Sequence, residues 1–204
     1  MARGGRIPIE FIAMDPTPAG PLLPLIARAE RHADRTALVD AAGTYTYRDL
    51  LTASARGARL LLDGAADLDE ARVGLLAPST FGYVAGQWAT WRAGGIVVPL
   101  CTTHPPAEWA YVLADAGIRT VVVHPDLIEG VAPLTTAGIR LVSTAELADG
   151  PAEGPLPGLS TSRRAMMVYT SGTTGRPKGV VTTHRGLQAQ VRSLVEAWEW
   201  SPED

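Results

Sequence analysis

Short apolar runs and longer amphipathic stretches alternate through the middle of the chain. Apolar runs over residues 73–77, 96–100 and 120–123 are typical of strands buried on both faces of a sheet. Between these runs, apolar side chains recur at helical spacing, at Phe81, Val84, Ala85, Trp88 and Trp91 and again at Trp109, Val112, Leu113 and Ala116. The pattern predicts an α/β fold, with a parallel sheet flanked by helices.

The residues before this region predict smaller elements. Residues 1–24 contain five prolines and should run irregularly over the surface. Apolar spacing predicts a short helix over 25–34. A hairpin should follow, because two strand-like runs, 36–39 and 44–46, flank a turn that contains Asp40 and ends in glycine.

Two further signals lie on either side of the alternating region. The sequence Thr46-Tyr-Arg-Asp49 resembles a capping box, with aspartate in place of the usual glutamate or glutamine, and predicts a helix that ends at Gly64. Residues 148–164 hold three glycines and three prolines and predict a long loop, either between domains or within one.

A segment rich in glycine, serine and threonine follows a strand predicted over 165–169. Its ten residues read Thr170-Ser-Gly-Thr-Thr-Gly-Arg-Pro-Lys-Gly179. Gly172 and Gly175 allow close approach of the backbone, and Lys178 adds a mobile positive charge. The hydroxyl groups belong to Thr170, Ser171, Thr173 and Thr174. Hydroxyls, exposed N–H groups and a lysine suit polyphosphate oxygens, whereas the alternative is a plain hairpin loop rich in turn residues.

Two common nucleotide-binding motifs do not fit this segment. A Walker A loop places four residues between its glycines and then Gly-Lys-Ser/Thr, whereas only two residues separate Gly172 from Gly175, and Lys178 precedes Gly179. No G-x-G-x-x-G turn opens a helix. A strand over 180–182 and a helix from about His184 should follow the segment. The apolar face of that helix would consist of Leu187, Val191, Leu194, Val195 and Trp198.

Composition narrows the classes of protein further. The net charge of −3 leaves no basic excess for nucleic acid. A single cysteine, Cys101, permits no disulfide and no cysteine-based zinc site, and the four histidines lack metal-ligand spacing, so we expect no protein-built metal site. The longest apolar runs have strand length, so we expect no membrane span and no signal peptide. A cytoplasmic location is therefore expected, with a short organellar presequence left open.

The string YTSGTTGRPKG over residues 169–179 resembles the phosphate-binding signature of the adenylate-forming enzymes, which include acyl-CoA synthetases and peptide-synthetase adenylation domains. Two weaker resemblances precede it in the right order, over residues 45–50 and 91–100. Together they extend the resemblance across about residues 20–200. The run from Gly94 to His104, with Glu108 and Tyr111 after it, is most similar to the malonate-type acyl-CoA synthetases.

The resemblance covers only the first part of the family's large domain. It implies that the whole of residues 1–204 is the N-terminal portion of an AMP-binding domain. The family's adenine-binding and ribose-binding segments, and its C-terminal lid with the catalytic lysine, have no counterpart here. We therefore expect no catalytic residue within the chain and no turnover by the chain alone. Three interpretations stay open: a sequence fragment, a truncated gene product, or half of a split enzyme, for which a complementary C-terminal half would be the partner.

The resemblance also implies a chemistry. Family members activate a carboxylic acid with ATP to an acyl-adenylate and then form a thioester, usually with coenzyme A, so the activity would be that of an acid–thiol ligase. Mg²⁺ would arrive with ATP. Thr170, Ser171, Thr173 and Thr174 would donate to β- and γ-phosphate oxygens, Gly172 and Gly175 would let the backbone close on them, and Lys178 would offset charge on the leaving pyrophosphate.

Two alternatives to an acyl-CoA synthetase stay open. One is an adenylation domain that loads a carrier protein, and the other is a non-catalytic nucleotide-binding module.

Two residues outside the ten-residue segment, His184 and Cys101, receive structural interpretations. His184 matches a histidine often found after the loop, but a helix-start or packing role is favoured. Cys101 has no evident histidine partner and is interpreted as structural.

Overall fold

The computed structural model describes residues 23–171 and 176–200 and, within that part, leaves out the side chains of residues 135–137. Six strands form the main sheet in the order β6-β5-β3-β4-β7-β8. All neighbours are parallel except β7 and β8, which are antiparallel. The strands are β3 (Arg72–Leu76), β4 (Ile96–Pro99), β5 (Thr120–Val123), β6 (Arg140–Ser143), β7 (Arg164–Thr170) and β8 (Lys178–Thr183). A separate hairpin pairs β1 (Thr36–Asp40) with β2 (Gly43–Thr46).

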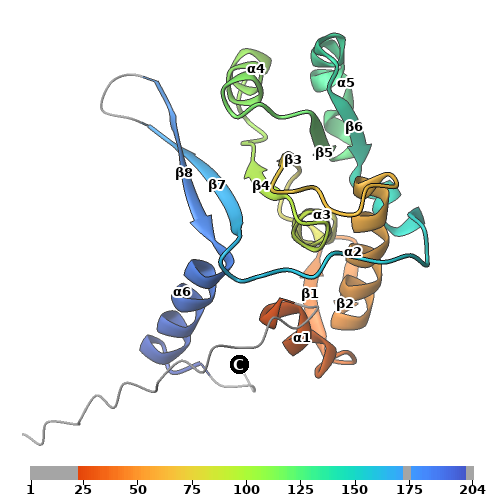
Figure 1. The fold of residues 1–204 in the computed structure, drawn as a ribbon, viewed down its shortest axis with the longest axis vertical. Coiled ribbons are helices and arrows are strands. Elements are labelled where there is room, and N and C mark those ends of the chain that lie inside the picture. Colours follow the sequence, from red (N-terminus) through yellow and green to blue (C-terminus); the bar gives the residue numbers. More distant parts are fainter. Residues whose placement is uncertain (1–22, 172–175, 201–204) are drawn as a thin grey trace, which may run out of the picture.

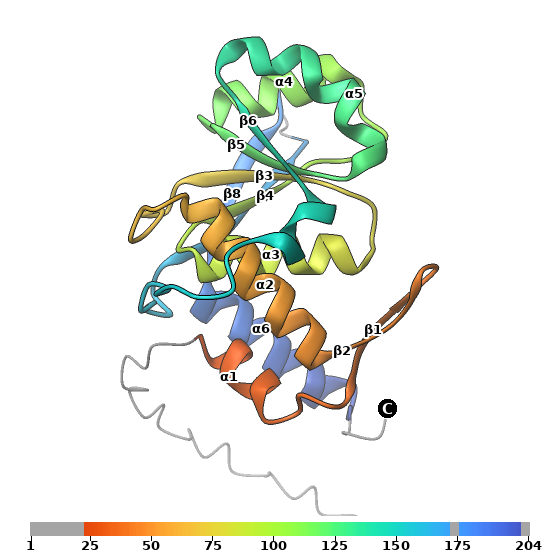
Figure 2. The same cartoon turned by 90° about the vertical axis from the view of Figure 1, so that its right-hand side faces the viewer.

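Helices lie on both faces of the parallel part of the sheet, as the alternating pattern predicts (Figures 1 and 2). The α-helices are α1 (Pro24–Glu30), α2 (Tyr47–Leu62), α3 (Phe81–Arg92), α4 (Pro106–Asp115), α5 (Ile128–Val131) and α6 (His184–Ala197). Short 3₁₀ segments span Pro125–Leu127, Ala132–Ala137 and Thr144–Asp149. Figure 2 shows α2 and α3 on one face and α4 and α5 on the other. The fold is therefore a mixed α/β sandwich with a mostly parallel sheet.

Two apolar cores fill the two sides of the sheet. The core under α2 and α3 includes Leu75, Val97 and Trp88, and the core under α4 includes Val98, Val121 and Leu113. Successive residues of one strand, such as Val97 and Val98, point into different cores because side chains alternate along a strand. Burial on both faces explains why these strands are uninterrupted apolar runs in the sequence.

The capping box predicted before α2 is present. The Thr46 hydroxyl accepts a hydrogen bond from the Asp49 N–H at 3.2 Å, and the Asp49 carboxylate accepts one from the Thr46 N–H at 2.7 Å. The C-terminal end of α2 differs slightly from the prediction. The helix ends at Leu62, and Asp63 takes the left-handed conformation (φ 50°) just before Gly64. The left-handed turn lets the chain leave the helix sharply.

Two features depart from the predicted elements, and a third confirms a prediction. Helix α1 ends at Glu30, four residues before the predicted end at Asp34, and a turn follows. Strand β6 was not predicted, because it lies at the sheet edge with only Val142 buried and therefore lacks an apolar run. The loop predicted over 148–164 is confirmed over residues 150–163, where no regular structure occurs. Arg59 of α2 holds this loop by donating to the carbonyl of Gly154 at 2.9 Å.

The segment with the phosphate-binding signature joins the antiparallel pair β7 and β8. The segment therefore connects the two strands of a β-hairpin, as the interpretation as a plain hairpin loop expects. This position is compatible with phosphate binding too, because a hairpin can present binding groups at its tip. Figure 1 shows this hairpin at the edge of the sheet, running alongside α4. None of the described helices is sufficiently long and apolar to cross a membrane.

Candidate functional site

Three of the predicted phosphate-binding residues meet at the end of the hairpin. Thr170 is the last residue of β7, Lys178 is the first residue of β8, and the two are paired in the antiparallel ladder. Ser171 directly follows Thr170, and all three residues are exposed. Gly172, Thr173, Thr174 and Gly175 lie outside the described residues. The fold therefore brings the backbones of these three residues to the same exposed end of the ladder.

A cavity of about 740 Å³ lies beside these groups. Its walls come from α4, from the residues that end and follow β4, and from both arms of the hairpin: Pro99, Leu100, Cys101, His104, Ala107, Glu108, Trp109, Tyr111, Val112, Tyr169, Thr170, Ser171, Arg176 and Pro177. The parallel strands β4 and β7 end at this cavity. Open α/β sheets bind ligands outside the carboxyl ends of their strands, so the position suits a binding site.

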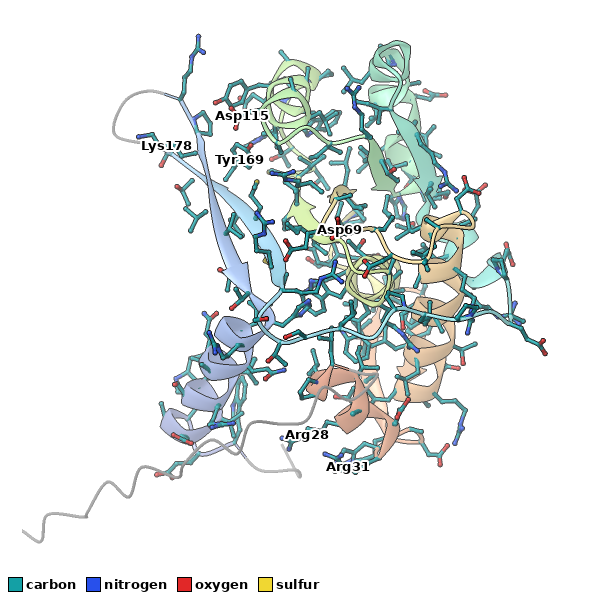
Figure 3. The ribbon with its side chains drawn as sticks, in the orientation of Figure 1. Arg28, Arg31, Asp69, Asp115, Tyr169 and Lys178 are labelled. Atoms are coloured by element: carbon teal, nitrogen blue, oxygen red, sulfur yellow. The ribbon has the colours of Figure 1, made fainter. Side chains whose placement is uncertain are left out.

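Helix α4 touches both arms of the hairpin. The Tyr111 hydroxyl donates to the carbonyl of Pro177 at 3.0 Å, on the arm that leads into β8. The Tyr169 hydroxyl donates to the Asp115 carboxylate at 2.6 Å, on the other arm. Figure 3 shows Asp115 and Tyr169 facing each other, with Lys178 further along the hairpin. Burial and the contact with Asp115 raise the pKa of Tyr169, so its proton stays in this hydrogen bond.

Cys101 lies on the cavity wall with its side chain exposed. Its thiol is 3.2 Å from the Thr103 hydroxyl, and hydrogen bonds from Thr103 lower the pKa of the thiol. His104 is paired with Glu108 at 2.9 Å instead of with the thiol. The Cys101 carbonyl accepts a hydrogen bond from the Trp109 indole at 2.8 Å, so the backbone of this residue supports α4. The structural role expected for the Cys101 side chain stays a prediction.

His184 lies at the opposite end of β8 from the candidate site. It begins α6, is 6% exposed and makes an edge contact with Trp91, with ring centroids 5.6 Å apart. Burial, with a smaller contribution from the charge of Arg163, lowers the pKa of His184 to about 4. A neutral, packed histidine at a helix start agrees with the packing role favoured from the sequence.

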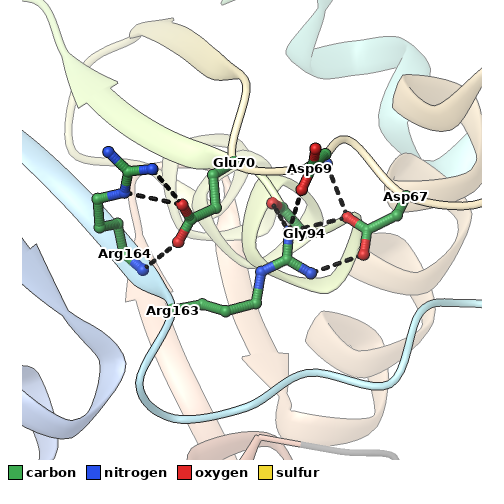
Figure 4. A network of polar contacts seen from close by, with 6 residues as sticks. All are labelled: Asp67, Asp69, Glu70, Gly94, Arg163 and Arg164. Atoms are coloured by element: carbon green, nitrogen blue, oxygen red, sulfur yellow. Dashed lines mark hydrogen bonds and ion pairs between the residues drawn. The ribbon is translucent and has the colours of Figure 1, made fainter.

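A network of five charged side chains, which the sequence pattern did not single out, holds the start of β7 (Figure 4): Asp67, Asp69, Glu70, Arg163 and Arg164. Arg163 donates to both carboxylate oxygens of Asp67, at 2.6 and 3.1 Å, and also to the carbonyl of Gly94 at 3.2 Å. Arg164 donates to Glu70 through its side chain and its backbone N–H. The partners are 94 to 96 residues apart in sequence, so no local pattern marks them.

The network also changes the acidity of its carboxyl groups. Burial raises the pKa of Asp67, but the hydrogen bonds and charge of Arg163, together with the Asp69 N–H, outweigh it and hold this pKa below its ordinary value. Hydrogen bonds from Arg164 hold the pKa of Glu70 below its ordinary value as well. Both carboxyl groups are therefore charged at neutral pH, and they fix the base of the hairpin to the segment before β3.

Among the described residues, no three His, Cys, Asp or Glu side chains gather as metal ligands. The donor set at the hairpin tip consists of hydroxyls and an ammonium group, which suit an anion such as phosphate. A mostly parallel α/β sheet with a hairpin and a cavity at the carboxyl ends of its strands defines the class as an α/β protein with a candidate anion site on a hairpin.

Comparison with known proteins identifies the family. The AMP-binding enzyme family matches residues 25–204, and the chain belongs to this family. It is 40% identical over 192 residues to the mitochondrial malonate–CoA ligase ACSF3 of Homo sapiens. That match covers 89% of this chain and 33% of the human protein, so the chain spans about a third of the length of this relative.

Solved structures agree with this assignment. ATP-bound MatB from Rhodopseudomonas palustris superposes with a TM-score of 0.74 at 27% identity, over 87% of this chain and 38% of that one. A long-chain fatty-acid–CoA ligase from Archaeoglobus fulgidus gives a TM-score of 0.77 at 26% identity, over 86% and 39% of the two chains. The resemblance to adenylate-forming enzymes seen in the sequence is confirmed, and the fold matches their N-terminal portion.

Proposed function

We propose that this chain supplies the phosphate-binding part of an acid–thiol ligase that makes acyl-CoA thioesters. In the first step, a carboxylate oxygen bonds to the α-phosphorus of ATP and the bond to pyrophosphate breaks. In the second, the thiolate of coenzyme A bonds to the acyl carbon and AMP leaves. The observation that carries the proposal is the hairpin tip, where Thr170, Ser171 and Lys178 meet beside the cavity in a chain of the AMP-binding family.

The proposed roles follow from the chemistry of each group. Thr170, Ser171, Thr173 and Thr174 donate hydrogen bonds to β- and γ-phosphate oxygens, while Gly172 and Gly175 let backbone N–H groups approach them. Lys178 offsets the charge that develops on the leaving pyrophosphate. Mg²⁺ enters with ATP and neutralises phosphate charge, and we assign no protein ligand to it.

The proposed domain assignment makes residues 1–204 the N-terminal portion of the AMP-binding domain. The adenine and ribose pockets and the catalytic lysine of the lid would come from sequence that matches the rest of the relatives, either in the same polypeptide or in a complementary C-terminal half. The acceptor is proposed to be coenzyme A, as in the ligases to which the chain is similar. A carrier-protein acceptor is the alternative, and an assay with each acceptor distinguishes them.

Lys178 offers the sharpest test, because it is the single lysine among the 204 residues. In the complete gene product, Lys178→Ala removes one charge-assisted phosphate contact. Such a contact contributes about 1.5–3 kcal/mol, which corresponds to a roughly 10- to 150-fold slower adenylate formation. Carboxylate-dependent exchange of pyrophosphate into ATP measures this step.

Three companion variants make the result specific. Lys178→Arg keeps the charge and should recover part of the rate. Arg192→Ala removes an exposed cation from α6, far from the tip, and should leave the rate unchanged. Thr174→Ala should also slow exchange. Unchanged kinetics in both Lys178→Ala and Thr174→Ala would remove the phosphate role.

We propose a small dicarboxylate such as malonate as the acid. The run from Gly94 to His104 supports this choice, as do relatives that are named malonate–CoA ligases. The fold itself does not discriminate, since a long-chain ligase superposes equally well. A panel of acids assayed with ATP and coenzyme A should show the highest kcat/KM for malonate or a similar diacid. A preference for dodecanoate or longer acids would contradict the malonate proposal and leave the class intact.

The cytoplasmic location expected from the sequence stays a prediction. The human relative is named as mitochondrial, so fractionation of cells into cytosol and organelles is the direct test. Recovery of the protein in an organellar fraction would replace the cytoplasmic expectation with a presequence-directed location.

A further inference from the structure

Helix α4 is fixed to the sheet independently of the hairpin. Trp109 and Leu113 are buried in the core on this side of the sheet. The Trp109 indole also donates to the carbonyl of Cys101, which ties the start of α4 to the segment after β4. The helix is therefore a rigid reference against which other elements can be held.

From this helix, two side chains one turn apart reach the two arms of the hairpin. Tyr111 donates to the carbonyl of Pro177, next to Lys178. Asp115 accepts from Tyr169, next to Thr170. The rings of Tyr111 and Tyr169 also meet edge to face, with centroids 6.5 Å apart at 82°. We call the contacts of Tyr111 and Asp115 with the hairpin the α4 clamp.

The hairpin itself is shaped to accept the clamp. Tyr169 is paired across the ladder with Gly179. A Cβ at Gly179 would lie 2.9 Å from the Met167 sulfur and 3.5 Å from the Tyr169 ring. The absence of a side chain at this position leaves room for Met167 and Tyr169, which both pack against the core under α4. The glycine thus serves the packing between hairpin and helix.

Without the clamp, the tip of the hairpin has few other supports. Residues 178–181 of β8 are exposed, and β8 is the edge strand of the sheet. An edge hairpin held only by its own ladder opens more readily than one docked on a helix. The two clamp contacts lie next to Thr170 and Lys178, the residues whose positions matter for phosphate.

We propose that Tyr111 and Asp115 are positioning residues that hold Thr170 and Lys178 in the geometry that binds the phosphates of ATP. The inference rests on the proposed function, because ATP is the ligand it assumes. The clamp acts through the hairpin arms and makes no contact with the acid. Its loss lowers the fraction of molecules with a competent tip and so raises the apparent dissociation constant for ATP.

The test uses the complete gene product with Tyr111→Phe, Asp115→Ala and Asp115→Asn. Tyr111→Phe removes one hydroxyl and keeps the ring, while Asp115→Asn keeps an acceptor for Tyr169. Tyr45→Phe is the matched control, because Tyr45 lies in β2 and stacks on Phe81. The first readout is the rate at which a lysine-specific protease cuts between Lys178 and Gly179, followed by mass spectrometry. The second is KM for ATP, with KM for the acid and the melting temperature alongside.

We expect Tyr111→Phe and Asp115→Ala to speed cleavage at Lys178 and to raise KM for ATP. The increase in KM should be about three- to ten-fold, because each change removes one ordinary hydrogen bond. KM for the acid and the melting temperature should stay near wild type. Asp115→Asn should keep cleavage and KM for ATP close to wild type, because it keeps an acceptor for Tyr169. Tyr45→Phe should change neither readout. Combining Asp115→Ala with Tyr169→Phe should add nothing to either single change, because both remove the same contact.

Unchanged cleavage in Tyr111→Phe and Asp115→Ala would overturn the clamp, and so would faster cleavage without a change in KM for ATP. An equal effect of Tyr45→Phe on either readout would overturn it too. Failure of the proposed function is recognised separately, since the unsubstituted protein would then show no acid-dependent pyrophosphate exchange. In that case the cleavage rates still decide whether the clamp holds the hairpin, and ATP binding at equilibrium replaces KM.

Discussion

At the scale of single residues, burial decides the chemistry of His184. The ring lies against Trp91 at the start of α6, and removal from water lowers its pKa from 6.5 to about 4. The folded chain therefore keeps this histidine neutral at a pH where the unfolded chain protonates it. Stability linked to the residue is fully present above about pH 6.5 and is lost as the pH falls toward 4, because the unfolded state then binds the extra proton.

We expect His184→Phe to flatten the pH dependence of stability between pH 6.5 and 4.5. Each unit of pKa difference corresponds to about 1.4 kcal/mol, so the unsubstituted protein should lose on the order of 2–3 kcal/mol across this window. Carboxyl groups with lowered pKa values, such as Asp67 and Glu70, lose their contribution only at lower pH. Urea unfolding at half-unit steps measures the slope. An equally steep loss in His184→Phe would assign the pH dependence to other groups.

At the scale of elements, the base of the hairpin depends on a backbone position that only glycine suits well. Gly94 has φ +83°, and a Cβ there would collide with the Asp67 carboxylate that Arg163 binds. The contact between Arg163 and Asp67 therefore requires a glycine in the turn after α3. Gly117, after α4, has φ +65° but open space around the Cβ position.

These two glycines form a matched pair for mutation. Gly117→Ala should cost only the strain of a left-handed alanine, about 1–2 kcal/mol. Gly94→Ala should cost the same strain and a further 1–3 kcal/mol or so, because Asp67 must move away from Arg163. Urea unfolding gives both values, and Asp67→Ala should remove much of the difference between them. Equal losses for the two glycine variants would show that the Asp67 contact contributes little.

At the scale of the whole molecule, the described residues leave a broad apolar surface uncovered. Val180 and Val181 of β8 are exposed, and so are Val191 of α6 and Trp198, which follows the helix, at 53% and 59%. The helix face predicted from the sequence exists, but only Leu187 packs against the core. Exposed apolar patches next to a free sheet edge favour association.

We therefore expect residues 1–204, expressed alone, to be poorly soluble and to show no acid-dependent pyrophosphate exchange. The family resemblance matches none of these residues to the adenine, ribose or acyl pockets, and positioning can account for about 7–11 kcal/mol of catalysis. The assay is pyrophosphate exchange with magnesium across a broad panel of acids. Val191→Glu with Val195→Glu should raise solubility without restoring exchange. Robust exchange by a soluble monomer of 204 residues would contradict this account.

The sequence by itself determined the elements whose signals are local. Continuous apolar runs predict β3, β4 and β5, because both faces of these strands are buried, and hydroxyl-rich residues between two strands predict the position of the hairpin tip. The capping box at Thr46 is equally local, since its two hydrogen bonds span three residues. The resemblance in residues 169–179 indicated the family, which the comparisons confirm.

Only the tertiary structure decided which strands are neighbours in the sheet and which distant residues contact each other. The order of the strands, the edge strand β6 and the antiparallel β8 depend on contacts that no periodicity encodes. Tyr111 and Pro177 are 66 residues apart, and Arg163 and Asp67 are 96 apart, so no local pattern in the sequence marks any of these partners. The physical reason is that apolar periodicity reports whether a residue is buried, whereas a hydrogen bond between distant segments depends on the path of the whole chain.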